Sequence, residues 1–404
     1  MPIIRVTSGV YCRGEEVVQK TAEVLGYEVL DDRVVIAETA KRFSLAESKL
    51  QRTLAGKVSA FNNFTRERER NLSCLKVVVA GLLERDDFIL HGVSGQLIPA
   101  SISHVLRVCV ISEMNRRVEL AVKDLGWTAK EAQKHIRKED EAVSLWTQHV
   151  LKADPWDAEI YDILIPTHKV QTDEAVQLVV RNARSGAVLK TKDSELAAMD
   201  FALAALVEGE LGKAGHEVVV TARNGKVTLS INRHTLMLSN LEEELKRLAK
   251  RVQGVQEVET KVGPGFYQAG VYRQVDVELP SRVLLVDDER EFVQTLSERL
   301  SMRDLGSVAV YDGEQALSFV EEEEPEVIVL DLRMPGIDGI EVLRRIKADH
   351  PDIEVIILTG HGSEKDQEVC MELGAFAYLQ KPVDIEKLSE TMKAAYQKVK
   401  ERRT

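Results

Sequence analysis

Residues 327–331, with the sequence Val-Ile-Val-Leu-Asp, constrain the fold more than any other stretch of the chain. Four successive apolar residues, most of them β-branched, are typical of a parallel strand that is buried on both faces. Asp331 would then lie at the carboxyl end of the strand, where open α/β sheets place their functional groups. Pro335 and Gly336 predict a tight loop after it. The stretch therefore predicts an α/β domain with a functional carboxylate.

Three more predicted strands end in polar residues: 283–286 before Asp287 and Asp288, 354–358 before Thr359, and 377–380 before Lys381. Clustered carboxylates repel one another, and they suit Mg²⁺, which prefers oxygen ligands. The candidate Mg²⁺ ligands are Asp287, Asp288, Asp331 and a backbone carbonyl of the loop near Arg333. A set of ordinary polar strand ends is the alternative, but their combination in one predicted sheet argues against it.

These residue types suit phosphoryl transfer to a carboxylate. Asp331 can attack phosphorus as a nucleophile. Lys381 can neutralise the charge that develops, and Thr359 can donate a hydrogen bond to a phosphoryl oxygen.

Residues 282–399 resemble the receiver domain of two-component response regulators. The resemblance rests on Leu-Val-Asp-Asp-Glu at 285–289, Leu-Asp-Leu-Arg-Met-Pro-Gly at 330–336, Leu-Thr-Gly at 358–360 and Lys-Pro at 381–382. It implies a flavodoxin-like doubly wound fold whose Asp331 accepts a phosphoryl group from a sensor histidine kinase. It also implies that Thr359 and Tyr378 form a switch, and it allows a homodimer through the receiver.

Length and composition limit the number of domains and the classes of partner that the chain can have. A chain of 404 residues is expected to hold about two to three domains. The net charge of −12 argues against nonspecific binding to nucleic acid. Four separated cysteines and the absence of a signal-peptide pattern predict a cytoplasmic protein. Because the chain ends soon after the last receiver helix, we expect no DNA-binding domain.

The N-terminal segment reads as a strand at 3–7, a loop from Gly9 to Gly14, and a helix at 15–25. This order is that of a phosphate-binding P-loop. However, Glu15 and Glu16 stand where a P-loop has Lys-Ser or Lys-Thr. A βα turn that binds nothing is therefore about as well supported as a phosphate site.

Residues 1–181 resemble the cytidylate kinase-like family of P-loop nucleoside monophosphate kinases. The resemblance rests on the opening strand, loop and helix, and on Tyr-Glu-Val-Leu-Asp-Asp-Arg at 27–33, Arg-Arg at 116–117, the 126–140 segment and Tyr-Asp at 161–162. It implies that the loop, including Gly9, Arg13 and Gly14, binds ATP phosphates. It further implies that Asp32 contacts an acceptor nucleotide and that Arg117 and Arg137 stabilise the transferred phosphoryl group.

Several residues depart from that family. Arg13 replaces a glycine, no lysine follows Gly14, and Val143 stands where an arginine is usual. Since phosphoryl transfer depends on positioned charge, these changes favour a kinase fold of reduced activity. An active (d)CMP-type kinase regulated by the receiver remains the alternative.

Between these regions, the sequence predicts a small α+β domain with helices at 196–211 and 238–252, a hairpin turning at Asn224-Gly225, and a strand at 254–259. It resembles the BON domain through Asn-Gly-Lys-Val-Thr-Leu at 224–229. This resemblance supports a scaffold for proteins or lipid, although contact with membrane lipid is disfavoured because the chain lacks an export signal. His91, His104 and His135 lack ligand spacing and are interpreted as structural or surface histidines.

The sequence thus predicts an α/β protein in four segments. They are a P-loop kinase-like parallel sheet at 1–190, a BON-like domain at 191–262, a linker at 263–280 and a receiver at 281–404. The leading hypothesis is a response regulator whose upstream domains act as output or sensor.

Overall fold

The chain forms two compact units in the computed structural model, Met1–Val58 with Arg68–Arg273 and Ser59–Glu67 with Gln274–Thr404. The structure describes residues 2–232, 235, 237–264, 266, 280, 282–303, 305–360 and 362–403. Within these residues, no helix combines the length and the apolar character that crossing a bilayer requires.

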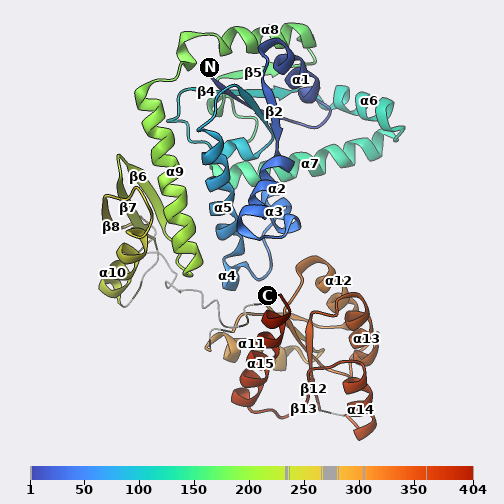
Figure 1. The fold of residues 1–404 in the computed structure, drawn as a ribbon. Helices are drawn as coiled ribbons and strands as arrows, with labels where there is room; N and C mark the ends of the chain where they lie inside the picture. Colours follow the sequence, from blue (N-terminus) through green and yellow to red (C-terminus); the bar gives the residue numbers. More distant parts are fainter. Residues whose placement is uncertain are drawn as a thin grey trace. The chain divides into compact units, whose positions relative to one another are not determined.

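The N-terminal sheet is parallel and has five strands in the order β2-β3-β1-β4-β5, which confirms the predicted α/β architecture (Figure 1). Its strands are β1 (Ile3–Ser8), β2 (Glu28–Asp31), β3 (Phe88–His91), β4 (Val105–Ile111) and β5 (Ile163–Pro166). Because β1 is central and nearly all of its residues are buried, its alternating side chains enter cores on both faces of the sheet.

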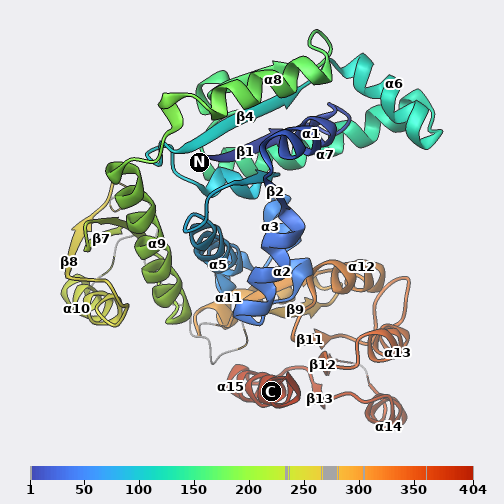
Figure 2. The same ribbon diagram turned by 45° about the horizontal axis from the view of Figure 1, so that its top comes forward.

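Helices cover both faces of this sheet. Ile4 and Val6 pack with α1 (Gly14–Leu25) and α8 (Thr172–Ala183) on one face, and Ile3 belongs to the core on the other. The second face is covered by α2 (Asp32–Phe43), α3 (Glu47–Leu54), α5 (Glu67–Leu82) and α7 (Ala129–Val150). Figure 1 shows α1 next to α8, and Figure 2 shows α2, α3 and α5 grouped together away from α8. Short helical segments are α4 (Asn62–Thr65), η1 (Ser94–Leu97), η2 (Ala158–Ile160) and η3 (Gly186–Val188).

A helical hairpin of α6 (Met114–Leu125) and α7 extends from the sheet (Figure 1). It has a small apolar core of Ala121, Ala132 and Ile136. Thr128 caps α7 in a capping box with Glu131, which fixes where the second helix begins.

The small domain contains α9 (Lys192–Lys213), β6 (Val219–Arg223), β7 (Lys226–Ile231), α10 (Leu238–Ala249) and β8 (Glu257–Val262). The predicted hairpin is confirmed, since Asn224 and Gly225 both have positive φ between antiparallel β6 and β7. The strand predicted at 254–259 instead begins at Glu257, because Gly254 adopts a left-handed turn. Most of the predicted linker, Gly265 and residues 267–279, lies outside the described residues.

The C-terminal sheet is also parallel and five-stranded, in the order β10-β9-β11-β12-β13. Its strands are β9 (Val283–Val286), β10 (Ser307–Val310), β11 (Val327–Leu330), β12 (Glu354–Thr359) and β13 (Ala377–Gln380). The helices are α11 (Arg290–Ser301), α12 (Gly313–Glu323), α13 (Gly339–Asp349), α14 (Glu364–Glu372) and α15 (Ile385–Arg403). Separate apolar cores lie on the two faces, as expected for a doubly wound sheet. Strand β10 was not predicted from the sequence, because the apolar run in Ser-Val-Ala-Val is only three residues long.

Candidate functional site

Three carboxylates meet at the carboxyl edge of the C-terminal sheet. Since Leu330 pairs with Val286, Asp331 and Asp287 follow neighbouring positions on β11 and β9. Carboxylate oxygens of Asp287, Asp288 and Asp331 lie within 4.8 Å of one another. Asp287 and Asp331 are only 4% and 5% exposed, so water screens their repulsion poorly.

Lys381 partly compensates this negative charge. Its Nζ lies 2.7 Å from Asp287 Oδ2, 2.9 Å from Glu289 Oε1 and 3.5 Å from Asp331 Oδ2. Burial alone would lower the pKa of Lys381, but hydrogen bonds with Asp287 and Glu289 outweigh it and raise the pKa. Burial raises the pKa of Asp287, against the opposing effect of Lys381. The ammonium is therefore held charged among acids.

The donor set fits a hard divalent cation. All three side chains offer oxygen atoms, and a single lysine leaves the carboxylate cluster with excess negative charge. The loop carrying Arg333 turns back at Gly339, where any side chain would overlap the Asp331 carbonyl. Asp331 Oδ1 accepts a hydrogen bond of 2.7 Å from the Leu332 N–H. The carboxylate is thereby oriented by its own loop.

Thr359 and Tyr378 lie next to this site on the neighbouring strands. Thr359 ends β12 and is fully buried, while Tyr378 lies in β13 opposite Ile357. A β-carbon on Gly362 would overlap the Tyr378 hydroxyl and approach the Thr359 methyl group to 3.0 Å. Both side chains therefore contact the same loop, so movement of one alters the surroundings of the other.

A second candidate site lies at the carboxyl edge of the N-terminal sheet. There, a cavity of about 930 Å³ is lined by Ser8, Gly9, Val10, Tyr11, Arg13, Gly14, Glu15, Glu16, His91, Leu120, Asp124 and His135. Tyr11 and Arg13 have left-handed backbone conformations, and the Arg13 side chain is exposed. The loop and the first turn of α1 thus form one wall, which carries two carboxylates and one guanidinium.

Arg117 is held in an internal clamp. Its guanidinium donates hydrogen bonds of 2.8 and 2.6 Å to Asp140 and a third, of 2.8 Å, from Nε to the Val10 carbonyl. These contacts connect α6, α7 and the loop. A phosphoryl group at Arg117 would have to compete with this carboxylate.

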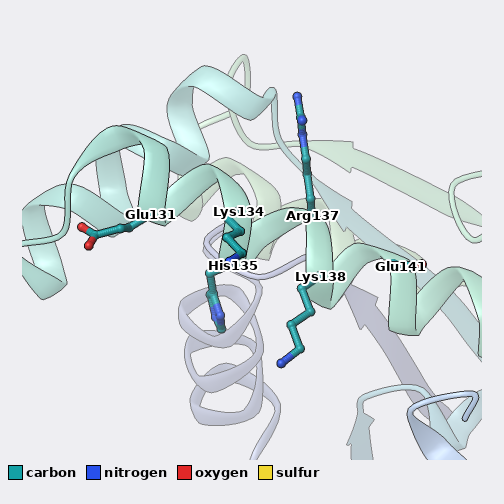
Figure 3. Close-up of a pocket in the computed structure, with 6 residues that line it drawn as sticks. All are labelled: Glu131, Lys134, His135, Arg137, Lys138 and Glu141. Carbon is teal, nitrogen blue, oxygen red and sulfur yellow. The ribbon is translucent and has the colours of Figure 1, made fainter.

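The side chains of Asp32 and Arg137 lie in different environments, one bonded to backbone and the other exposed. The Asp32 carboxylate accepts hydrogen bonds of 2.9 Å from the N–H groups of both Val93 and Ser94. Burial raises the pKa of Asp32, although these hydrogen bonds oppose the shift. Arg137 is exposed on α7 and projects away from His135 and Lys138, as Figure 3 shows.

Comparisons with known proteins match a family model to each of the two parallel-sheet regions. The model of the response regulator receiver domain matches residues 283–393, and that of the cytidylate kinase-like family matches residues 3–169. Residues 283–393 are a response regulator receiver domain. Residues 3–169 are a cytidylate kinase-like domain. The chain is therefore a receiver fused to a kinase-like domain.

Individual relatives match about the length of the receiver. Response regulator MprA of Mycolicibacterium vanbaalenii is 34% identical over 116 residues, 29% of this chain and 50% of the relative. MprA of Mycobacterium avium is 33% identical over 119 residues, 30% of this chain and 52% of the relative. The chain thus spans about half the length of the curated relatives it matches. A solved receiver domain protein from Clostridium thermocellum has 32% identity and a TM-score of 0.29, covering 30% of this chain and 97% of its own.

The structure brings the predicted receiver residues together, whereas those predicted for the kinase-like domain do not all line one cavity, although Arg117 contacts the loop at Gly9 and Val10. Gly9, Arg13 and Gly14 line the N-terminal cavity, whereas Asp32, Arg117 and Arg137 are not among its described lining residues.

Sequence reasoning missed Asp140, the partner of Arg117, and the close approach of Ser8 to His91. Strand order could have indicated the second pair, since Ser8 and His91 end adjacent strands. However, that order is a tertiary property.

Proposed function

We propose that the receiver accepts a phosphoryl group on Asp331 from a sensor histidine kinase, with Mg²⁺ as cofactor. The observation that carries this proposal is the convergence of Asp287, Asp288 and Asp331 beside Lys381. The three carboxylates and a carbonyl near Arg333 would hold the metal. When bound, Mg²⁺ supplies positive charge that offsets the charge of the incoming phosphoryl oxygens.

The side chains have distinct roles in this proposal. Asp331 supplies the attacking carboxylate oxygen, which the Leu332 N–H orients through the opposite oxygen. Lys381 moves from its acidic partners toward the phosphoryl oxygens, and Thr359 donates its hydroxyl hydrogen bond to one of them. The movement of Thr359 changes the loop contact that it shares with Tyr378, which gives the switch.

The test is labelling of the full chain by a small-molecule phosphodonor such as acetyl phosphate with Mg²⁺. We expect stoichiometric labelling that Asp331→Asn or chelation of Mg²⁺ abolishes. Asp338→Asn is the matched control, because Asp338 caps α13 in the same region and asparagine caps helices equally well. Labelling that persists in Asp331→Asn would refute the assignment.

We propose that the kinase-like domain has little or no nucleoside monophosphate kinase activity. The clamp on Arg117 and the carboxylates of Glu15 and Glu16 on the cavity wall support this proposal. Binding without turnover would suit a nucleotide sensor. In an assay of the full chain with ATP and CMP, we expect turnover well below about one per second, the low end of ordinary enzymes. Faster turnover would instead support a (d)CMP-type kinase regulated by the receiver.

We also propose that the chain is divided into segments 1–190, 191–262, 263–280 and 281–404. In this proposal, segment 191–262 is a BON-like module that binds proteins. Lys226 pairs with Glu257 and Glu259 at 3.5 and 2.7 Å, so this exposed sheet surface carries both charges. Mixed charge suits a protein partner better than an anionic lipid surface. Retention of the chain on anionic liposomes would favour the lipid alternative. Cytoplasmic location and homodimerisation through the receiver are further parts of the proposal.

A further inference from the structure

Ser8 and His91 form a hydrogen-bonded pair at the edge of the N-terminal cavity. Ser8 ends β1 and His91 ends β3, and Ser8 Oγ lies 3.0 Å from His91 Nε2. Val6 pairs with His91 in the sheet, so Ser8, two residues later, points to the same face as His91. Because both residues line the cavity, a bound molecule can reach the pair.

The start of α1 lies directly against this pair. A side chain at Gly14 would overlap the Ser8 hydroxyl, so glycine permits the close approach. Arg13 occupies the N-cap position of α1 but makes no side-chain capping hydrogen bond. The first-turn N–H groups of this helix are therefore suited to stabilise an oxyanion formed beside Ser8.

His91 is held in place by the loop that follows it. Gly92 has φ +136°, and a β-carbon there would overlap the Asp32 carboxylate. Asp32 in turn holds the N–H groups of Val93 and Ser94 at 2.9 Å. Burial lowers the pKa of His91, with Asp32 and Glu15 opposing the shift. The imidazole is consequently neutral at pH 7 and able to accept a proton.

We propose that Ser8 is a nucleophile activated by His91, and that this cavity is a second reactive centre which hydrolyses small acyl esters. A serine and a base within hydrogen-bond reach, with the base oriented by further groups, are the features that activate a hydroxyl. Glu15, Glu16 and Asp124 line the cavity with Arg13, so its charge favours neutral or cationic esters over polyphosphates. This activity goes beyond the receiver function proposed above and does not depend on it.

The reaction balances with water as the only co-reactant. Ser8 Oγ attacks the ester carbonyl carbon while its proton passes to His91 Nε2, in the tautomer that carries hydrogen on Nδ1. The alcohol leaves with that proton, and Ser8 is acylated. Water then gives a proton to His91 as its oxygen attacks the acyl carbon, and the carboxylic acid departs as Ser8 recovers the proton. Asp32 acts as a positioning residue through the 92–94 loop.

The test treats the full chain with a fluorophosphonate probe and maps the modified residue by mass spectrometry. We expect labelling at Ser8 that Ser8→Ala abolishes and that His91→Gln slows by about 10²-fold, the low end of general-base contributions. The labelling rate should fall in acid as His91 becomes protonated, at a lower pH than for an ordinary histidine, because burial lowers the pKa of His91. Ser101→Ala is the control, since Ser101 is exposed and precedes the amino end of β4.

A second variant tests the pair in case Ser8→Ala or His91→Gln fails to fold. Ser8→Cys keeps a small nucleophile, and we expect it to react with iodoacetamide at least tenfold faster than Ser8→Cys combined with His91→Gln. The native thiols contribute little background, because Cys12, Cys74, Cys109 and Cys370 are all buried. Failure of Ser8 to label in a folded chain, or equal thiol reactivity with and without His91, would show that the hydrogen bond between Ser8 and His91 is structural only. Neither result would bear on phosphorylation of Asp331.

Discussion

Arg117 and Asp140 form a two-pronged ion pair, with Nη1–Oδ2 and Nη2–Oδ1 distances of 2.8 and 2.6 Å. The side chains are 7% and 22% exposed, so water compensates the guanidinium only slightly. Because the same arginine also bonds the Val10 carbonyl, the pair fixes the 9–14 loop against the α6–α7 hairpin. The arginine expected to stabilise a phosphoryl group therefore also connects the loop to the helical hairpin.

Replacing Asp140 by asparagine should destabilise the N-terminal unit. Removing one charge leaves a mostly buried guanidinium without its counterion, and we expect a loss of roughly 2 kcal/mol in the free energy of unfolding, less than for a fully buried pair. Urea unfolding followed by tryptophan fluorescence measures this loss, since Trp127, Trp146 and Trp156 all lie in the N-terminal unit. Glu141→Gln is the control, being exposed on the same helix, and should change stability by less than about 0.5 kcal/mol. Equal losses of unfolding free energy in Asp140→Asn and Glu141→Gln would show that the Arg117–Asp140 pair does not stabilise the unit.

His149 should make the same unit sensitive to acid. Burial, aided by Arg68 and Lys152, lowers the pKa of His149 to about 4 in the folded chain. The unfolded chain takes up this proton near pH 6.5, so the contribution to stability is complete above that pH and is lost as the pH falls toward 4. After discounting for partial exposure, we expect wild type to lose about 1 kcal/mol more than His149→Gln between pH 7.5 and pH 5. Parallel losses in the two proteins, measured by urea unfolding, would exclude this histidine as a cause.

The switch should respond to a phosphoryl mimic. The Tyr378 hydroxyl is buried and has no hydrogen-bond partner within the described residues, so its present position is not secured by polar contacts. When Thr359 moves toward a phosphoryl group, space opens into which Tyr378 can turn. Adding beryllofluoride and Mg²⁺ should therefore change hydrogen exchange over residues 358–385, and Asp331→Asn should suppress the change. An unchanged exchange pattern in the wild-type chain would rule out this switch.

The sequence predicted that the receiver's carboxylates and lysine would lie together, because these residues follow buried strands of a parallel sheet. Once Val327–Leu330 is recognised as a strand, Asp331 must lie at the carboxyl edge of the sheet. The neighbouring strand β9 places Asp287 beside it, and Lys381 reaches it from the end of β13, two strands away. Periodicity and strand polarity, which are local properties, were sufficient there. Of the five strands in this sheet, β10 was not predicted, because its apolar run is short.

The kinase-like site was less predictable because its polar side chains contact residues that are distant in the sequence. Arg117 was expected at a phosphoryl group, but its orientation depends on Asp140, one helix further on. His91 was interpreted as an ordinary histidine, and its contact with Ser8 follows from the β3-β1 neighbourhood in the sheet. Charges and motifs can be read locally, whereas partners of a polar side chain depend on tertiary packing.

The identity of the phosphorylated atom tests the central claim most directly. After treatment with acetyl phosphate and Mg²⁺, borohydride reduction converts an aspartyl phosphate to homoserine, which peptide mass spectrometry locates. We predict homoserine at position 331 in the wild-type chain and in Asp338→Asn, and none in a sample without phosphodonor. Homoserine at Asp287 or Asp288 instead, or unmodified Asp331 in a chain that carries the label, would contradict the account.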